Sequence, residues 1–420
     1  MRIITLISAF IFLTGLSKAQ TNTYLEDLAA LKSILQKTPS FKAQMKGNKQ
    51  DNYINLFNRL SSDTTSELNN YKYFYNLSQL LFPLRDNHLG FYQLPDYKNF
   101  KTKETIDSFI ATKEFYLYPT CEINIDSLKI ELAKKPADSI EGIYHYDKFY
   151  SVGLFRSGDR EYIGVVLDTN IKLWQKGQIA IHLYEYIPNH YKAIYGHPLY
   201  KNFLLQTNEK YKNQSLVNSY FYGSYSQSIY TKELGHADYM NLPTNSSKFE
   251  LKTISDNIQY LLIRTFQADK STMLSSQKFY DSITSALNKT YLVLDLRNNE
   301  GGAKKEMKKY FSLLKKYTKH GHLYILLNNG TLSQAEIFTL KLQKLKNVTT
   351  VGQTTKGMLT YGSNYGKRNK LPSGKFEIYP TDMKGDAKLL KYEDYGIKPK
   401  ITLENDQNWI EQVTEIIEKK

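Results

Sequence analysis

The chain has 420 residues, of which 41% are hydrophobic and 23% are charged, with 22 glycines and 11 prolines. This composition is typical of a globular protein and excludes a collagen-like or disordered chain. A single cysteine, Cys121, excludes an intramolecular disulfide and every zinc or redox motif of the CxxC type.

The formal net charge is +15, and the lysines are spread along the chain without a basic tail. An excess of this size can indicate acidic partners. Because the lysines stand among many tyrosines and do not form a tail, we do not expect nucleic-acid binding. A basic surface that faces anionic polymers of the cell envelope is compatible with the same charge.

Residues 1–19 have the features of a secretory signal peptide. Arg2 supplies the positive charge, residues 3–16 are apolar, and small residues at positions 17 and 19 predict cleavage after Ala19. The apolar run is shorter than the ~20 residues that span a bilayer, although a retained anchor is the alternative. We therefore expect an exported protein, in the periplasm or the medium, that does not span the membrane.

Three stretches with leucines and aromatic residues at helical spacing follow, and they predict an N-terminal helical cap over residues 20–95. From residue 138 to 246, short β-branched and aromatic segments alternate with turn residues, which predicts an antiparallel β domain. The tyrosine-rich end of this domain, residues 220–230, fits either ordinary packing or a binding surface.

From residue 248 the pattern changes to alternating strands and helices. Near-continuous apolar strands indicate a sheet that is covered on both faces. We expect strands near 260–264, 291–296, 323–327 and 348–352, and helices over 275–288, 304–319 and 334–345. The lysines of the helix over 304–319 are most simply a solvated face.

A serine stands where a buried strand turns into a helix, in the segment Asn328-Asn-Gly-Thr-Leu-Ser333-Gln-Ala-Glu336. A hydroxyl at a helix N-terminus lies near free N–H groups and a dipole that favour a developing oxyanion. The same residues also form an S-x-x-E capping box, so Ser333 fits a helix cap as well as a nucleophile. On this segment alone the cap is favoured.

Three further segments could complete a catalytic site. The paired glycines Gly301 and Gly302 follow a strand and could point N–H groups at an oxyanion, although a plain turn also explains them. His88 could remove a proton from a serine if the fold brings the two together; otherwise it is a core histidine. A carboxylate of Glu393 or Asp394 could orient an imidazole, or belong to a surface turn. No HExxH, GxSxG or phosphate-loop motif is present, and we expect no cofactor and no metal.

Taken together, these segments resemble the S41 peptidases, the group of the tail-specific (C-terminal-processing) proteases and the tricorn core. The blocks that carry the resemblance are residues 294–302, 326–338 and 351–357, with further support from Asp86-Asn-His88 and Tyr395-Gly-Ile-Lys-Pro. The resemblance implies an α/β (α+β) catalytic core of ClpP/crotonase-like type over residues 248–420. The helical cap and an inserted antiparallel β domain would precede this core.

Residue by residue, the resemblance implies Ser333 as nucleophile, His88 as base and Glu393 as the residue that orients it, with Asp394 as the alternative. The oxyanion donors would be the backbone N–H of Gly302, or of Gly301, and that of Gln334. Met358 stands where Ser/Lys members of the family carry a lysine, and Lys356 lies two residues earlier, so the chain resembles the Ser/His branch. Glu300 also departs from the family's turn, and no PDZ pattern is found.

The sequence therefore predicts a secreted serine endopeptidase of S41 type that acts on a peptide or protein. The alternative is a catalytically inactive S41-like protein of the cell envelope that binds a peptide or another ligand. In a third hypothesis the β domain binds an apolar ligand or an envelope glycan. The sequence does not indicate the oligomeric state.

Overall fold

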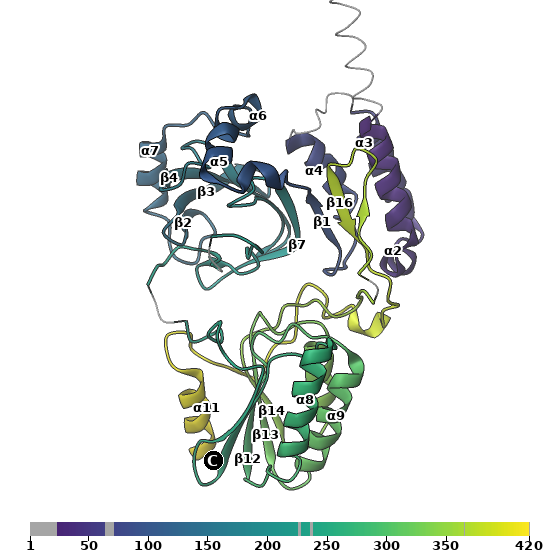
Figure 1. Ribbon diagram of the computed structural model, residues 1–420, viewed down its shortest axis with the longest axis vertical. Coiled ribbons are helices and arrows are strands. Elements are labelled where there is room, and N and C mark those ends of the chain that lie inside the picture. The colour runs from purple at the N-terminus through teal and green to yellow at the C-terminus, as the bar shows by residue number, and fades with distance from the viewer. Residues whose placement is uncertain (1–22, 64–70, 226–227, 236–237, 365, 420) are drawn as a thin grey trace, which may run out of the picture. The chain divides into compact units, whose positions relative to one another are not determined.

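The computed structural model describes residues 23–63, 71–225, 228–235, 238–364 and 366–419 (Figure 1). The predicted signal peptide, residues 1–19, lies outside the described residues. Contacts divide the chain into two compact units, Met1–Leu234 with Ser363–Lys384, and Gly235–Gly362 with Gly385–Lys420. Within the described part of the chain, no helix is both long and apolar enough to cross a membrane.

The first unit begins with helices whose apolar stripes pack together. Leu28, Leu31 and Leu35 are fully buried at helical spacing, as expected for a helix with one face in a core. The Thr38 side chain accepts a hydrogen bond from the Phe41 N–H and starts the next helix. The helices are residues 23–37, α2 (Pro39–Gln44), α3 (Asn48–Ser61) and α4 (Tyr71–Gln79).

Strands β2 to β9 of the first unit form an antiparallel sheet that closes on itself, because β9 pairs with β2 and β8 pairs with β7. Its interior is filled by aromatic side chains, among them Tyr144, Tyr146 and Trp174. The strands are β2 (Gly142–Tyr146), β3 (Tyr150–Gly158), β4 (Glu161–Thr169), β5 (Ile179–Ile187), β6 (His190–Gly196), β7 (Phe203–Lys212), β8 (Ser215–Leu216) and β9 (Tyr230–Thr231). Between the cap and this sheet lie η1 (Tyr97–Phe100), α5 (Lys103–Ile110), α6 (Lys113–Tyr116) and α7 (Ile125–Leu132).

A strand from late in the chain also belongs to the first unit. β1 (Gly90–Gln93) pairs with β7 on one side and with β16 (Phe376–Tyr379) on the other, and β16 pairs with β15 (Asn369–Lys370). All these pairings are antiparallel. Residues 363–384, which the sequence pattern places in the core domain, therefore extend the sheet of the first unit.

The second unit is built on a mostly parallel sheet in the order β10-β11-β12-β13-β14-β17. β10 is antiparallel to β11, and the remaining neighbours are parallel. The strands are β10 (Phe249–Thr253), β11 (Ile258–Ile263), β12 (Tyr291–Asp295), β13 (His322–Leu327), β14 (Val348–Gly352) and β17 (Ile401–Thr402).

Both faces of this sheet are covered, which explains its near-continuous apolar strands (Figure 1). α8 (Lys270–Ile283), α9 (Lys304–Tyr317) and α10 (Gln334–Leu342) pack on one face, and α11 (Trp409–Glu418) packs on the other. The short helix η2 (Ala387–Leu389) precedes β17. The predicted mixed helix and sheet fold with an antiparallel β domain is confirmed, whereas the ClpP/crotonase-like character of the core stays a prediction.

Candidate active site

Ser333 lies at a sharp turn between β13 and α10. Its backbone has φ 58° and ψ −120°, a conformation that costs a non-glycine residue about 1–3 kcal/mol. The Thr331 N–H donates to the Asn328 carbonyl at 3.0 Å and closes the turn that leads to it. A strained strand-to-helix turn of this kind is the geometry that presents a nucleophilic serine in the α/β-hydrolases.

The carboxylate of Glu336 holds this turn in place. It is fully buried, and its Oε2 accepts hydrogen bonds from the N–H groups of Ser333 at 3.1 Å and Met358 at 3.0 Å. Its Oε1 accepts from the Thr355 hydroxyl at 2.5 Å and from the Gly357 N–H at 2.9 Å. The S-x-x-E pattern predicts Glu336 as half of a capping box, but no local pattern predicts its role in fixing the segment 355–358.

The turn with Gly301 and Gly302 directly contacts Ser333 and Gln334. A Cβ on Gly301 (φ +84°) would lie 2.7 Å from the Gln334 nitrogen and 2.9 Å from the Ser333 Cβ. A Cβ on Gly302 would lie 2.2 Å from the Phe266 backbone, so both positions require glycine. The structure thus brings together Ser333, Gln334 and the glycine pair.

The two glycines differ as hydrogen-bond donors. The Gly301 N–H already donates to the Asn299 side chain at 2.9 Å. Neither the Gly302 N–H nor the Gln334 N–H makes a hydrogen bond within the described residues. Gly302 is also exposed. Of the two candidate glycines, the geometry therefore favours Gly302, whose backbone N–H is available to donate to an oxyanion.

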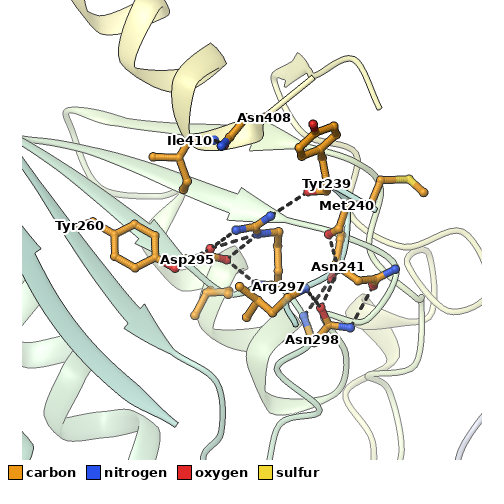
Figure 2. Close-up of polar contacts among 12 residues, drawn as sticks. Tyr239, Met240, Asn241, Tyr260, Asp295, Arg297, Asn298, Asn408 and Ile410 are labelled. Carbon is orange, nitrogen blue, oxygen red and sulfur yellow. Dashed lines mark hydrogen bonds and ion pairs between the residues drawn. The ribbon is translucent and has the colours of Figure 1, made fainter. Parts of the chain in front are cut away.

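The loop before the glycines is fixed by a buried ion pair, which Figure 2 shows. Arg297 Nη2 lies 2.7 Å from Asp295 Oδ2, and Arg297 Nη1 donates to the Tyr239 carbonyl at 2.8 Å. Burial and the neighbouring Asp295 raise the pKa of Tyr260, whose hydroxyl donates to Asp295 Oδ2 at 2.9 Å.

Asparagine side chains continue this network (Figure 2). Asn298 Nδ2 donates to Asn241 Oδ1 at 3.0 Å, and Asn328 Nδ2 donates to the Met240 carbonyl at 2.9 Å. The Asn298 N–H donates to Asn328 Oδ1 at 3.0 Å. The loops after β12 and β13, which carry the glycine pair and Ser333, are therefore joined to each other and to the segment around residue 240.

Glu393 and Asp394 are fully buried, so they do not form an exposed turn. Glu393 Oε2 accepts hydrogen bonds from the N–H groups of Leu359 at 3.1 Å and Thr360 at 2.9 Å. The Met358 carbonyl, one residue earlier, accepts from the Ser333 N–H at 2.9 Å. Glu393 and Ser333 therefore bind the same segment, whereas Asp394 contributes its N–H to the Gly357 carbonyl.

His88 belongs to the first unit, and Ser333 belongs to the second. In its own unit His88 donates its backbone N–H to Asp86 Oδ1 at 3.3 Å, and Asp86 Oδ2 accepts from the Thr381 hydroxyl at 2.6 Å. Burial raises the pKa of Asp86 to about 6. The pairing of His88 with Ser333 stays a prediction.

A pocket of about 350 Å³ lies in the first unit and contains none of the predicted site residues. Its lining combines Lys101, Lys103 and Lys172 with Ile106, Leu173 and Tyr225. Among the described residues, no group of three or more His, Cys, Asp or Glu side chains is placed to hold a metal ion.

Residues 303–403 match the model of peptidase family S41. The resemblance seen in the sequence is confirmed, and Ser333, Gln334 and Glu393 lie inside the S41 match. Gly301, Gly302 and His88 lie outside it.

Solved structures with similarity to this chain include mature CPAF, at 12% identity over 95% of this chain and 97% of that chain, with a TM-score of 0.42. The photosystem II D1 C-terminal processing protease is 13% identical over 94% and 97%, with a TM-score of 0.37. A lipoprotein from Streptococcus agalactiae is 21% identical over 42% and 71%, with a TM-score of 0.30. No curated protein matches the chain.

Proposed function

We propose that this chain is an exported serine endopeptidase of the S41 type that hydrolyses peptide bonds in a peptide or protein substrate. The observation that carries the proposal is the strained backbone of Ser333, which directly contacts the glycine turn. Strain of this kind persists where the surrounding structure maintains it, and it concentrates at functional sites. The match of residues 303–403 to the model of peptidase family S41 supports the same proposal.

In the proposed reaction Ser333 Oγ attacks the carbonyl carbon of the scissile bond while His88 accepts the hydroxyl proton. The carbonyl oxygen becomes an oxyanion, and the N–H groups of Gly302 and Gln334 donate to it. His88 then gives its proton to the departing amine, which leaves an acyl-enzyme on Ser333. Water, deprotonated by His88, releases the carboxylate product and regenerates the serine. Glu393, or Asp394, orients His88.

The test is labelling of the mature protein with a fluorophosphonate probe, together with cleavage of casein. We expect Ser333→Ala and His88→Ala to lose labelling, and Ser333→Ala to lower cleavage at least about a thousandfold. Ser275→Ala removes an exposed hydroxyl of the same unit, on α8, and should leave both readouts unchanged. Undiminished cleavage by Ser333→Ala would contradict the proposal.

A second candidate function is binding without cleavage, in a catalytically inactive S41-like protein. Met358, at the position of the family's lysine, is the observation that favours it. A peptide would then bind as an added strand beside a sheet edge and remain intact. A well-folded wild-type protein that binds peptides, resists labelling and cleaves no substrate would support this function over the first.

A further inference from the structure

The charged residues on the exposed face of α9 are all lysines. Between residues 303 and 347 the chain has ten lysines and two glutamates. Both glutamates, Glu306 and Glu336, are buried. Of the α9 lysines, Lys309 pairs with Glu306 at 2.9 Å. The exposed lysines of α9 and its C-terminal end make no ion pair within the described residues; they are Lys304, Lys305, Lys308, Lys315, Lys316 and Lys319.

The lysines share one side of the helix. At 3.6 residues per turn, all the lysines from 304 to 319 fall within an arc of about 140°. Ser312 lies within this arc, and Met307, Tyr310 and Leu314 point the opposite way into the core. The stripe is roughly 22 Å long, at 1.5 Å per residue. We call these exposed lysines the α9 lysine face.

The N-terminal part of this face is unfavourable for the stability of the helix, whereas Lys315 and Lys316 lie in the last turn, where the helix dipole favours positive charge. Like charges at i and i+4, such as Lys304 with Lys308 and Lys315 with Lys319, each cost about 0.2–0.5 kcal/mol. Lys304 and Lys305 also occupy the first turn, where the helix dipole favours acidic residues. The exposed face of an ordinary helix carries both positive and negative side chains. A face that carries lysines alone therefore indicates an acidic binding partner.

The α9 lysine face begins at the candidate active site. α9 starts two residues after Gly302, whose neighbour Gly301 contacts Ser333 and Gln334. An extended peptide of about seven residues matches the length of the stripe, at roughly 3.3 Å per residue. A chain bound along the face would have its continuation beside Ser333.

We propose that the α9 lysine face binds an acidic segment of the polypeptide substrate and so directs the adjoining residues to Ser333. The proposal rests on the proposed function. Complementary charge raises the rate of encounter and the local concentration of substrate, and both effects weaken as salt increases. The preferred substrates are therefore proteins or peptides with an acidic stretch near the cleaved bond.

The test measures binding apart from cleavage, in the Ser333→Ala background. The probe is a fluorescein-labelled poly-L-glutamate of about 20 residues, followed by anisotropy at low salt. Replacing Lys304, Lys308, Lys315 and Lys319 by glutamine should weaken binding at least about tenfold. The control replaces Lys42, Lys46, Lys49 and Lys98, exposed lysines of the first unit, and should change binding less than about twofold. The four α9 lysines changed to arginine should retain binding.

Three results would overturn the proposal: equal binding by the glutamine variant, equal weakening in the control variant, or binding of dextran sulfate without binding of poly-glutamate. The last would assign the face to an acidic polysaccharide. Failure of the proposed function is seen separately, because an inactive wild-type protein would still bind the probe. In an active protein, the α9 glutamine variant should raise KM for an acidic peptide and leave KM for a neutral peptide unchanged.

Discussion

Glu336 links two segments of the second unit through one buried side chain. Its two oxygens accept hydrogen bonds from Ser333, Thr355, Gly357 and Met358. All four partners donate hydrogen bonds to Glu336. An ionised carboxylate only accepts hydrogen bonds, so it matches these surroundings. The backbone of Ser333 therefore keeps its strained conformation partly through this carboxylate.

We predict that Glu336→Gln lowers the rates of casein cleavage and of fluorophosphonate labelling at least about tenfold. The glutamine NH₂ would replace one of the two oxygens and would face an N–H or O–H donor there. The loss of stability should be about 1–3 kcal/mol. Thermal unfolding separates the two effects, since the activity is measured well below the transition. As a positioning residue, Glu336 should affect kcat more than KM.

Glu306→Gln provides the matched control for this change. Glu306 is also buried in the second unit, but it pairs with Lys309 and lies on α9. Its replacement should lower stability by a comparable amount and leave kcat within about twofold. If Glu336→Gln keeps full activity, the carboxylate does not maintain the geometry of Ser333.

At the scale of single residues, the sequence predicted the local part of this site. The S-x-x-E spacing correctly identified the bond between Glu336 and the Ser333 N–H. The bonds from Glu336 to residues 355–358 join segments about twenty positions apart, and no local pattern reveals them. Burial of Glu393 and Asp394 is likewise a property of packing, which is why an exposed turn was an open alternative.

Among the elements, the glycine turn between β12 and α9 lies directly against the Ser333 turn. We predict that Gly301→Ala abolishes labelling and lowers kcat at least about a hundredfold, since the added Cβ would lie 2.7 Å from the Gln334 nitrogen. The positive φ adds about 1–2 kcal/mol of strain. Stability and activity, measured on the same preparation, give both quantities.

Gly374→Ala isolates the conformational part of this effect. Gly374 has φ +70°, and a Cβ there would meet no atom within 4 Å. Its replacement should cost about 1–2 kcal/mol of stability with kcat unchanged. Equal losses of activity in the two variants would show that contact with the Gln334 backbone is not the cause.

The sequence predicted the elements of the second unit better than their ends. The apolar strands and the intervening helices are present at the expected places. The helix expected over 275–288 is α8 at Lys270–Ile283, because Asp269 caps it by accepting a hydrogen bond from the Thr272 N–H at 3.0 Å. β17 is short, at Ile401–Thr402, since it meets β14 at two positions.

For the whole molecule, the division into units depends on pairings between distant residues. Gly90 to Gln93 pair with Phe376 to Tyr379, almost 290 positions later. A strand pattern at 376–379 reveals that a strand is present but not which sheet it joins, so the sequence alone could not assign residues 363–384 to the first unit. Long-range order of this kind comes from burial against Phe74 and Phe91.

The first unit also contains buried histidines that affect its response to acid. Burial lowers the pKa of His182 to about 3 and that of His197 to about 4. Both are below the ordinary value, so the unfolded state binds more protons and stability is lost as pH falls from 6.5 towards these values. Asp86 acts oppositely, because its pKa is raised to about 6 and protonation stabilises the folded state below that pH. The two histidines outweigh the single carboxyl, with a net loss on the order of 3 kcal/mol near pH 4.5.

We predict that the first unit unfolds at a higher pH than the second when the protein is acidified, since exposed carboxylates titrate only near pH 4. The two tryptophans of the chain report on the units separately, because Trp174 lies in the first and Trp409 in the second. With 5-fluorotryptophan in both positions, the ¹⁹F resonance of Trp174 should lose its native shift first.

His182→Phe keeps a ring against Tyr71, whose ring centroid lies 3.7 Å from that of His182, and should move the Trp174 transition to lower pH. His320→Phe, at an exposed histidine, should move neither resonance. Loss of the Trp409 shift first, or an unchanged Trp174 transition in His182→Phe, would show that His182 does not govern the acid response.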